Sequence, residues 1–289
     1  MKKAILFLGM LLAVTMHSKA QYVAVADTVP LWPNGAPVEN GLTTGFQDTK
    51  FIIMNNHTAY LHIYKAQNPN GMCVLACPGG GYIALAMQHE GSSMAMFYNR
   101  LGITLVVLQY RMPNGHSEIP LSDGEEAMRY IRRHAAEWGV DPHKVGVQGA
   151  SAGGHLAASL ATLYSSEETR PDFQILYYPV ISMKPGITHA GSRSFLITAN
   201  PTPQQEERFT LEKQVNSHTP QAFIMLSADD DVVPPVNSLD YFNALVDNKV
   251  PASMHIFPTG GHGWGWQESF KYHLQVEMEL EKWLETIYK

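Results

Sequence analysis

The feature that most constrains this chain is the run Gly-Ala-Ser-Ala-Gly-Gly-His at positions 149–155. An apolar, strand-like run at residues 144–147 precedes it, and an alanine-rich, helix-like run at residues 156–164 follows it. Between a strand and a helix, a G-x-S-x-G sequence holds its serine on a turn so tight that the hydroxyl oxygen projects from the backbone. The flanking glycines are needed because larger side chains would collide with the strand and the helix. The pattern predicts a nucleophile at Ser151; an ordinary strand–helix turn is the alternative.

The order of the predicted elements indicates the fold class. From residue 72 onward, short apolar runs typical of strands buried on both faces alternate with helix-like runs. The apolar runs cover residues 72–77, 104–109, 144–147, 173–178, 222–227 and 253–257. Such alternation predicts an α/β fold with a mainly parallel central sheet and helices on both faces. In such sheets the functional site lies beyond the carboxyl ends of the strands.

The clearest predicted helix follows residue 121. Ser122 with Glu125 three positions later has the spacing of a capping box, which predicts a helix from Ser122 to about Trp138. Further helices are expected at residues 92–101, 156–164, 206–215, 235–246 and 269–288, with an insertion over residues 179–219.

The first twenty residues have the three parts of a secretory signal peptide. Lys2 and Lys3 precede an apolar run at residues 4–14, and Ser18-Lys19-Ala20 places small residues around a spacer. The apolar run is too short for a membrane span, which needs about 20 residues. We therefore expect cleavage near Ala20 and export to the periplasm or the medium.

The remaining residues, 21–289, are expected to form a single domain. Residues 21–50 are rich in Pro, Gly, Asn and Thr and predict an irregular arm that wraps the domain. Residues 51–54 and 59–64 predict two strands joined by a turn at residues 55–57.

Charge and cysteine content exclude several classes of partner and site. The formal charge is −6, and it becomes −9 without residues 1–20, which hold three lysines and no acid. An acidic protein does not favour nucleic acid or an anionic membrane as a partner.

Cys73 and Cys77 are four positions apart on one predicted strand, about 13 Å at strand rise, whereas a disulfide needs Cα atoms within about 7 Å. We expect two buried free thiols and no metal site, because no second pair of cysteines or histidines completes one.

Two groups at strand ends complete a nucleophilic arrangement. His262 stands among glycines after the strand at residues 253–257, and such a loop can carry a histidine back over the sheet as the base for Ser151. Three consecutive aspartates, at positions 229–231, follow the strand at residues 222–227. One carboxylate is enough to accept the Nδ1–H of the histidine. A turn residue without a role is the alternative for His262, and a solvated turn position is the alternative for each aspartate.

A glycine run at residues 79–81 follows the strand at residues 72–77. It can present backbone N–H groups to an oxyanion, together with the N–H of Ala152 just after the serine. A phosphate-binding loop is excluded because no G-K-[S/T] follows and no G-x-G-x-x-G opens a helix.

Taken together, these motifs resemble the α/β-hydrolase superfamily, whose order of residues is Ser, Asp, His. The chain is most similar to the exported bacterial group of acetyl xylan esterases and related carbohydrate esterases, often labelled xylanase. The resemblance covers most of the chain from about residue 30. The matching stretches are residues 31–37, 77–82, 90–91, 110–111, 127–132, 149–156 and 260–263.

The resemblance also selects one acid. The acidic stretch of the family is similar to Asp-x-x-Val-Pro, which puts the acid at Asp230, while Asp229 and Asp231 remain candidates. The family often has histidine before the glycine run, where this chain has Pro78. Because the oxyanion role uses backbone N–H groups, this departure leaves that role intact.

By this resemblance, the chain is expected to hydrolyse esters without a metal or another cofactor. Ser151 would attack an acyl carbonyl with His262 as base and then acid, and N–H groups of Gly80 or Gly81 and of Ala152 would hold the oxyanion. Water would then release the acyl-enzyme. The implied substrates are acetylated plant polysaccharide or oligosaccharide, or a small ester. Residues that flank the motifs are candidates to line the sugar site, with local packing as the alternative. They are Tyr82, His89, Glu90, Trp264 and Trp266.

Several other functions compete with this one. A feruloyl esterase or a general carboxylesterase differs only in its acyl pocket. A serine exopeptidase of the prolyl-oligopeptidase kind usually carries a large extra domain, for which there are too few residues here. A non-catalytic binding protein on this fold typically lacks one of the three residues that this chain has. A glycosidase needs two carboxylates flanking a sugar bond, and no pair here has such a context.

Overall fold

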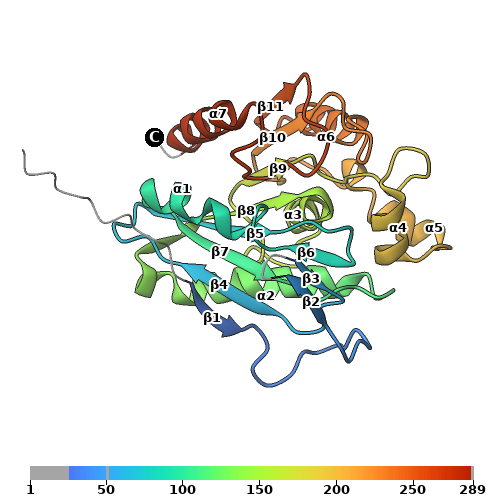
Figure 1. The fold of residues 1–289 in the computed structure, drawn as a ribbon, viewed down its shortest axis with the longest axis horizontal. Coiled ribbons are helices and arrows are strands. Elements are labelled where there is room, and N and C mark those ends of the chain that lie inside the picture. The colour runs from blue at the N-terminus through green and yellow to red at the C-terminus, as the bar shows by residue number, and fades with distance from the viewer. Residues whose placement is uncertain (1–25, 50–51, 288–289) are drawn as a thin grey trace, which may run out of the picture.

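The computed structural model describes residues 26–49 and 52–287 (Figure 1). The predicted signal peptide and its cleavage point lie outside these residues. An eight-stranded sheet in the order β1-β4-β7-β5-β8-β9-β10-β11 forms the centre. In that order the strands are Asp27–Pro30, Tyr60–Tyr64, Thr104–Gln109, Gly71–Cys77, Val140–Ala150, Gln174–Tyr177, Ala222–Ser227 and Ala252–Phe257.

The sheet is parallel from β7 to β11. At the other edge β4 pairs antiparallel with both β7 and β1, so β4 alone runs in the opposite direction. The central strands are buried almost throughout, since helices cover both faces, and this explains their continuous apolar sequences. The prediction of an α/β fold with a mainly parallel sheet is confirmed.

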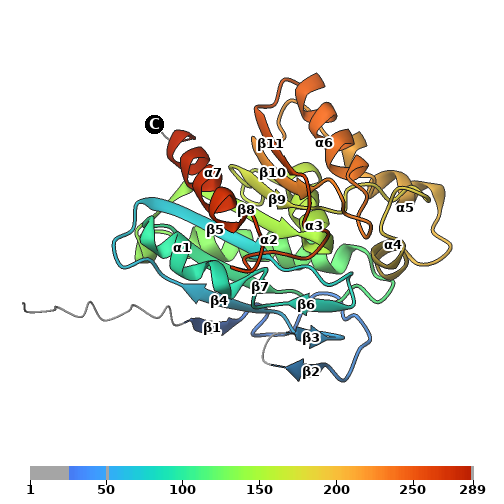
Figure 2. The ribbon, with the colours of Figure 1, turned by 45° about the horizontal axis from the view of Figure 1, so that its top comes forward.

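Helices form the two outer layers. One layer contains α1 (Ala95–Arg100) and α7 (His273–Thr286), whose side chains line a common cavity. The other contains α2 (Glu118–His134) and α3 (Ser151–Thr162), which pack against each other (Figure 2). α6 (Val236–Asp247) packs against β10 and β11. Within the described residues, no helix has both the length and the apolar character that crossing a membrane requires.

The N-terminal part is more regular than the sequence suggested. The predicted arm includes β1, which pairs with β4 so that Val29 lies opposite Leu61. The predicted strands at residues 51–54 and 59–64 exist as β3 (Ile52–Met54) and β4, but they do not pair. β3 joins a small sheet with β2 (Phe46–Thr49) and β6 (Ala84–Ala86).

The turn between β3 and β4 is held by the loop that follows β7, which is why no hairpin forms. Asn56 is buried and its side-chain amide donates to the carbonyl groups of Thr58 and Tyr110. The N–H of Met112 donates to the carbonyl of Asn56. These bonds direct the chain from the small sheet into the main one.

The predicted start of α2 at Ser122 is wrong. The helix begins four residues earlier, at Glu118, and the Ser122 hydroxyl donates to the carbonyl of Ile119 inside it. Pro120 is tolerated because the N–H groups of the first turn have no partner within a helix. The helix ends at His134, and a 3-10 turn (Ala136–Trp138) leads to Gly139 at φ 66°.

The predicted insertion between β9 and β10 contains two helices. They are α4 (Ala190–Ile197), which periodicity did not reveal, and α5 (Pro203–Arg208), followed by a 3-10 turn at Leu211–Lys213. Both cysteines are buried in β5 and unpaired, as predicted. Burial raises the pKa of both thiols, so they stay protonated and unreactive.

A buried ion pair fastens the N-terminal segment to α2. The guanidinium of Arg111 donates to both carboxylate oxygens of Asp123, with a shortest distance of 2.7 Å. The backbone N–H of Arg111 and the indole N–H of Trp32 donate to the same carboxylate. Asp123 thus joins the N-terminal segment, the loop after β7 and α2.

We expect Asp123→Asn to lower the free energy of unfolding by about 3–5 kcal/mol, because it leaves the Arg111 guanidinium buried without a counter-charge. Arg208→Gln is the control, since it breaks an exposed pair with Glu118 and should cost about 1 kcal/mol or less. Urea unfolding of both variants measures the difference. Equal losses would contradict a special role for the buried pair.

Candidate active site

Ser151 lies on a sharp turn where β8 ends and α3 begins, and its φ is +54°. Few residues other than glycine adopt this conformation, so the surrounding backbone must hold it. A Cβ added to Gly149 would lie 2.1 Å from the carbonyl oxygen of Gly153. A Cβ added to Gly153 would lie 2.0 Å from the carbonyl oxygen of Cys77. The steric requirement for both glycines is confirmed.

A continuous line of hydrogen bonds runs from the serine to one aspartate. The Ser151 hydroxyl lies 2.8 Å from Nε2 of His262, and Nδ1 of His262 lies 2.7 Å from the Oδ2 of Asp230. The other oxygen of Asp230 accepts from the N–H groups of Val232 and Val233, at 3.0 and 2.9 Å. Because the carboxylate is fully hydrogen-bonded, it holds the imidazole in the tautomer whose Nε2 accepts the serine proton.

The three neighbouring aspartates have different surroundings. Asp230 is 5 % exposed and faces the histidine. Asp229 is exposed and accepts from the N–H groups of Gly261 and Gly260, at 2.8 and 3.2 Å, which lowers its pKa. These bonds shape residues 258–265, the loop that carries His262 (the histidine loop). Asp231 is exposed. Of the three candidates, the structure places only Asp230 against His262.

The glycine run after β5 packs directly beside the serine. A Cβ on Gly79 would lie 2.9 Å from the Cβ of Ser151, and one on Gly80 would lie 2.2 Å from the carbonyl oxygen of Ala84. Gly80 and Gly81 have φ values of 132° and 65°, which favour glycine. The run therefore needs glycine to lie this close to the nucleophile.

The N–H groups in this loop are not equivalent. The N–H of Gly79 donates to the Oε2 of Glu90 at 2.7 Å and is therefore occupied. Within the described chain, no acceptor is paired with the N–H of Gly80 or Gly81. Ala152 is the second residue of α3, where an N–H has no partner within the helix. Gly80, Gly81 and Ala152 are the predicted oxyanion donors, and their N–H groups are available for that role.

A buried chain of hydrogen bonds joins the glycine loop to the histidine loop. Glu90 accepts from Gly79 with one oxygen and from the Tyr178 hydroxyl with the other, at 2.8 Å. The Tyr178 oxygen in turn accepts from the N–H of Gly265 at 2.7 Å. Burial raises the pKa of Tyr178, so it remains a hydrogen-bond donor. Its ring also packs edge-on against His262, with centroids 4.7 Å apart.

The residues expected to line a sugar site differ in their exposure. Tyr82 is 2 % exposed and its hydroxyl lies 2.9 Å from Nδ1 of the buried His155. Trp264 is 4 % exposed and stacks on Phe270. Glu90 is buried in the chain of hydrogen bonds described above. The side chains of Tyr82, Glu90 and Trp264 thus pack against the interior, and their contact with a sugar stays a prediction. His89 is half-buried and stays a candidate.

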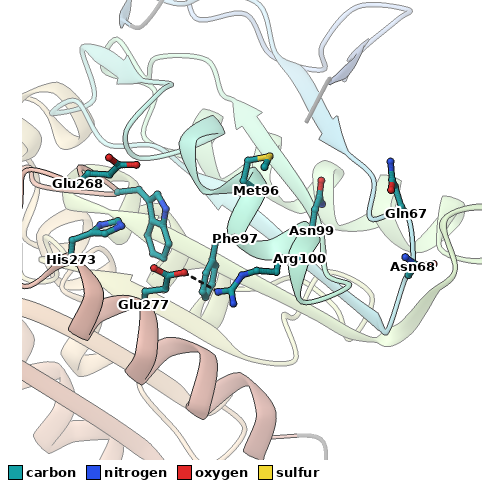
Figure 3. A pocket seen from close by; sticks show the side chains of 10 residues that line it. Gln67, Asn68, Met96, Phe97, Asn99, Arg100, Glu268, His273 and Glu277 are labelled. Atoms are coloured by element: carbon teal, nitrogen blue, oxygen red, sulfur yellow. Dashed lines mark hydrogen bonds and ion pairs between the residues drawn. The ribbon is translucent and has the colours of Figure 1, made fainter. Parts of the chain in front are cut away.

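Trp266 lies in a different cavity from Ser151. This cavity, of about 560 Å³, is lined by α1, α7 and the segments near residues 67 and 267 (Figure 3). There Trp266 packs on Phe97 with ring centroids 4.7 Å apart, and Arg100 pairs with Glu277 at 2.9 Å. None of the residues that line it belongs to the glycine loop or to the line from Ser151 to Asp230.

Sequence reasoning missed the supporting residue Tyr178. Tyr178 follows directly on β9 at the carboxyl edge of the sheet, and that position was the one signal available for it. The described residues contain no cluster of three or more His, Cys, Asp or Glu side chains arranged to hold a metal ion.

Comparison with known proteins agrees with this architecture. Residues 74–265 match a family described as alpha/beta hydrolase fold. An acetylxylan esterase of Xylanibacter ruminicola is 38 % identical over 233 residues, which cover 79 % of this chain and 48 % of that protein. An endo-1,4-beta-xylanase B of Butyrivibrio fibrisolvens is 40 % identical over 231 residues, covering 75 % and 35 %. The chain thus spans about half, or less, of the length of these curated relatives.

A solved structure resembles the chain over almost its whole length. It is the acetyl ester-xyloside bifunctional hydrolase from Caldicellulosiruptor lactoaceticus, with a TM-score of 0.78 and 33 % sequence identity. The match covers 92 % of this chain and 97 % of that one. Together with the family match over residues 74–265, it shows that the chain belongs to the alpha/beta hydrolase fold family.

Proposed function

We propose that this protein is an exported serine esterase that removes acetyl groups from plant polysaccharide or oligosaccharide. The observation that carries the proposal is the hydrogen-bonded line from Ser151 through His262 to the buried Asp230, at 2.8 and 2.7 Å. A hydroxyl activated by such a base becomes a nucleophile toward an acyl carbon. No other cluster in the described chain combines a strained serine, a base and a buried acid.

The first half of the reaction forms an acyl-enzyme. The Ser151 oxygen attacks the carbonyl carbon of the ester while its proton moves to Nε2 of His262. The carbonyl π electrons move to the oxygen, which is stabilised by the N–H of Ala152 and by N–H groups of Gly80 and Gly81. As the tetrahedral intermediate collapses, the bond to the alcohol oxygen breaks and His262 gives its proton to the leaving alcohol.

The second half regenerates the serine. Water takes the place of the alcohol and loses a proton to His262 as its oxygen attacks the acyl carbon. The carbon–oxygen bond to Ser151 then breaks, the serine oxygen regains the proton, and the carboxylic acid leaves. Asp230 stays ionised and stabilises the imidazolium that forms in each half.

Two kinds of support favour an acetylated carbohydrate as the substrate. The first curated relative is named an acetylxylan esterase, and the solved structure with 33 % identity is named an acetyl ester-xyloside bifunctional hydrolase. The signal-peptide pattern in residues 1–20 fits a substrate that is met outside the cytoplasm. A metal is not required by this chemistry.

We expect the protein to release acetate from acetylated xylan and 4-nitrophenol from its acetate. It should release little ferulate from methyl ferulate and no product from a dipeptide amide. Ser151→Ala should lower kcat on both acetates by about 10⁴-fold or more while the circular dichroism spectrum stays unchanged. Rates are followed by acetate release and by nitrophenol absorbance. Turnover that survives in the alanine variant would overturn the proposal. Ferulate release faster than acetate release would show that the preferred acyl group is feruloyl and not acetyl.

The three aspartates offer a matched set of variants. Asp230→Asn should lower kcat by about 10⁴-fold, because an amide no longer selects the histidine tautomer. Asp229→Ala removes two hydrogen bonds that shape the histidine loop and should lower kcat by about tenfold or less. Asp231→Asn should leave kcat unchanged, since Asp231 is exposed. Steady-state kinetics on 4-nitrophenyl acetate rank them, and a ranking led by Asp229 would contradict the assignment of the acid.

Glu90→Gln tests the link between the two loops. A glutamine has one acceptor oxygen, so its NH₂ group would face either the N–H of Gly79 or the hydroxyl of Tyr178. We expect kcat to fall by about 10–100-fold, since the loss of one hydrogen bond moves the glycine loop at residues 79–81. Glu277→Gln, in the cavity of Figure 3, is the control and should leave kcat within twofold of wild type. An unchanged kcat for Glu90→Gln would rule out a positioning role for the carboxylate.

A further inference from the structure

His189 is a half-buried histidine that the proposed mechanism does not use. It lies in the segment between β9 and β10, immediately before α4. Its Cε1 lies 3.7 Å from the place that a Cβ on Gly81 would occupy, so the imidazole borders the glycine loop. His262 and Asp230 are also near enough to influence the pKa of His189. The glycine loop and His262 both adjoin Ser151, and His189 therefore stands at the rim of the space above the nucleophile.

One nitrogen of this imidazole is already used. Nδ1 of His189 accepts from the N–H of Ser192 at 3.2 Å, which caps α4, and lies 2.8 Å from the Ser192 hydroxyl. With Nδ1 as the acceptor, the proton of the neutral ring is on Nε2. Within the described part of the chain, no hydrogen bond is formed by Nε2. Burial, followed by the charge of His262, lowers the pKa of His189, and Asp230 opposes this shift. The ring thus offers one neutral N–H donor.

The segment that carries His189 is fastened to the body of the domain. The buried Asn237 of α6 accepts from the N–H groups of Ile181 and Ser182 and donates to the carbonyl of Ile187. Arg193 donates to the carbonyl of Met183 at 2.9 Å. The donor is therefore held in place before substrate binds, as a residue that recognises a substrate must be.

The chemistry of an acetyl ester indicates what this donor meets. An acetyl group has one strong hydrogen-bond acceptor, its carbonyl oxygen, and N–H groups of the glycine loop and of Ala152 are available for it. A further donor at the rim then faces the alcohol half of the ester. A sugar ring presents several hydroxyl oxygens there, whereas an aryl or ethyl group presents none.

We propose that the Nε2–H of His189 donates a hydrogen bond to a hydroxyl oxygen of the sugar in the alcohol half of the substrate, and so favours acetylated carbohydrate over simple acetates. The proposal rests on the esterase function proposed above and adds a specificity-determining residue to it. His189 binds substrate, and the covalent steps remain with Ser151 and His262.

Two substitutions separate recognition from the capping of α4. His189→Asn keeps a side-chain acceptor for the N–H of Ser192, because asparagine is a good N-cap, but no donor reaches the position of Nε2. His189→Gln extends an NH₂ group to about that position and loses the cap. Thermal unfolding of both variants shows whether a change in KM or kcat arises from a loss of stability.

The measurement compares KM and kcat for mono-acetylated xylobiose and for 4-nitrophenyl acetate. For His189→Asn we expect KM for the sugar ester to rise about tenfold, as the loss of one hydrogen bond implies, with kcat and the nitrophenyl acetate kinetics within twofold of wild type. His189→Gln should recover part of the lost affinity despite its missing cap. Calorimetry with Ser151→Ala, with and without His189→Asn, should show the same loss of affinity for the sugar ester without turnover.

Other results would overturn the inference in distinguishable ways. Equal losses on both substrates would mean that His189 acts on the acyl group or on the fold, and an unchanged KM for the sugar ester would mean that it does not bind the sugar. A wild-type protein that hydrolyses 4-nitrophenyl acetate but not the sugar ester refutes the inference and leaves a serine esterase. A wild-type protein inactive on both esters refutes the proposed function itself.

Discussion

The close approach of two backbones beside Ser151 is the constraint on which the site depends. The turn after β8 passes so near the end of β5 that a Cβ on Gly153 would lie 2.0 Å from the Cys77 carbonyl oxygen. Because β5 and β8 are adjacent parallel strands, both chains leave the sheet at the same edge. β8 continues into the turn at Ser151, and β5 continues into the glycine run at residues 79–81. Strand pairing therefore brings the proposed nucleophile and the proposed oxyanion donors together.

The second half of the site is joined to the first by buried polar contacts. Glu90 lies between two donors, the N–H of Gly79 and the hydroxyl of Tyr178, and the Tyr178 oxygen accepts from the N–H of Gly265. A buried carboxyl group is costly unless its oxygens are hydrogen-bonded, and here both are. The histidine loop thus has two fastenings, this chain on its inner side and Asp229 on its outer side. Together they fix the distance from His262 to Ser151.

The sequence allowed most of the elements and the positions of Ser151 and His262 at strand ends to be predicted, because both depend on local signals. Buried strands have apolar runs, and Ser151 and His262 stand among glycines at strand ends. The choice of Asp230 followed from resemblance, and the structure supplies the physical reason, since only that carboxylate faces the histidine. The start of α2 was misjudged because Ser122 and Glu125 have the spacing of a capping box, although the helix begins at Glu118 and its first turn tolerates Pro120.

Proximity to a motif along the chain was a poor guide to which side chains are exposed. Tyr82 directly follows the glycine run, but its φ of +62° accompanies a ring that is buried against Tyr110 and His155. Trp264 lies two residues after His262 and is buried against Phe270. A turn of the backbone within one or two residues decides whether a side chain points into the core or into solvent. Neither composition nor periodicity records that turn.

The residues proposed to perform the chemistry and the residues that border them have different physical origins. Ser151, the glycine run and His262 are placed by the ends of parallel strands, so their geometry depends on the sheet. His189 belongs to the segment between β9 and β10, which is held through side chains such as Asn237 and Arg193. Changes of the side chain at His189 leave the strand pairing intact and alter the border of the site. On this fold, substrate preference can therefore change while the hydrogen-bonded line from Ser151 to Asp230 stays the same.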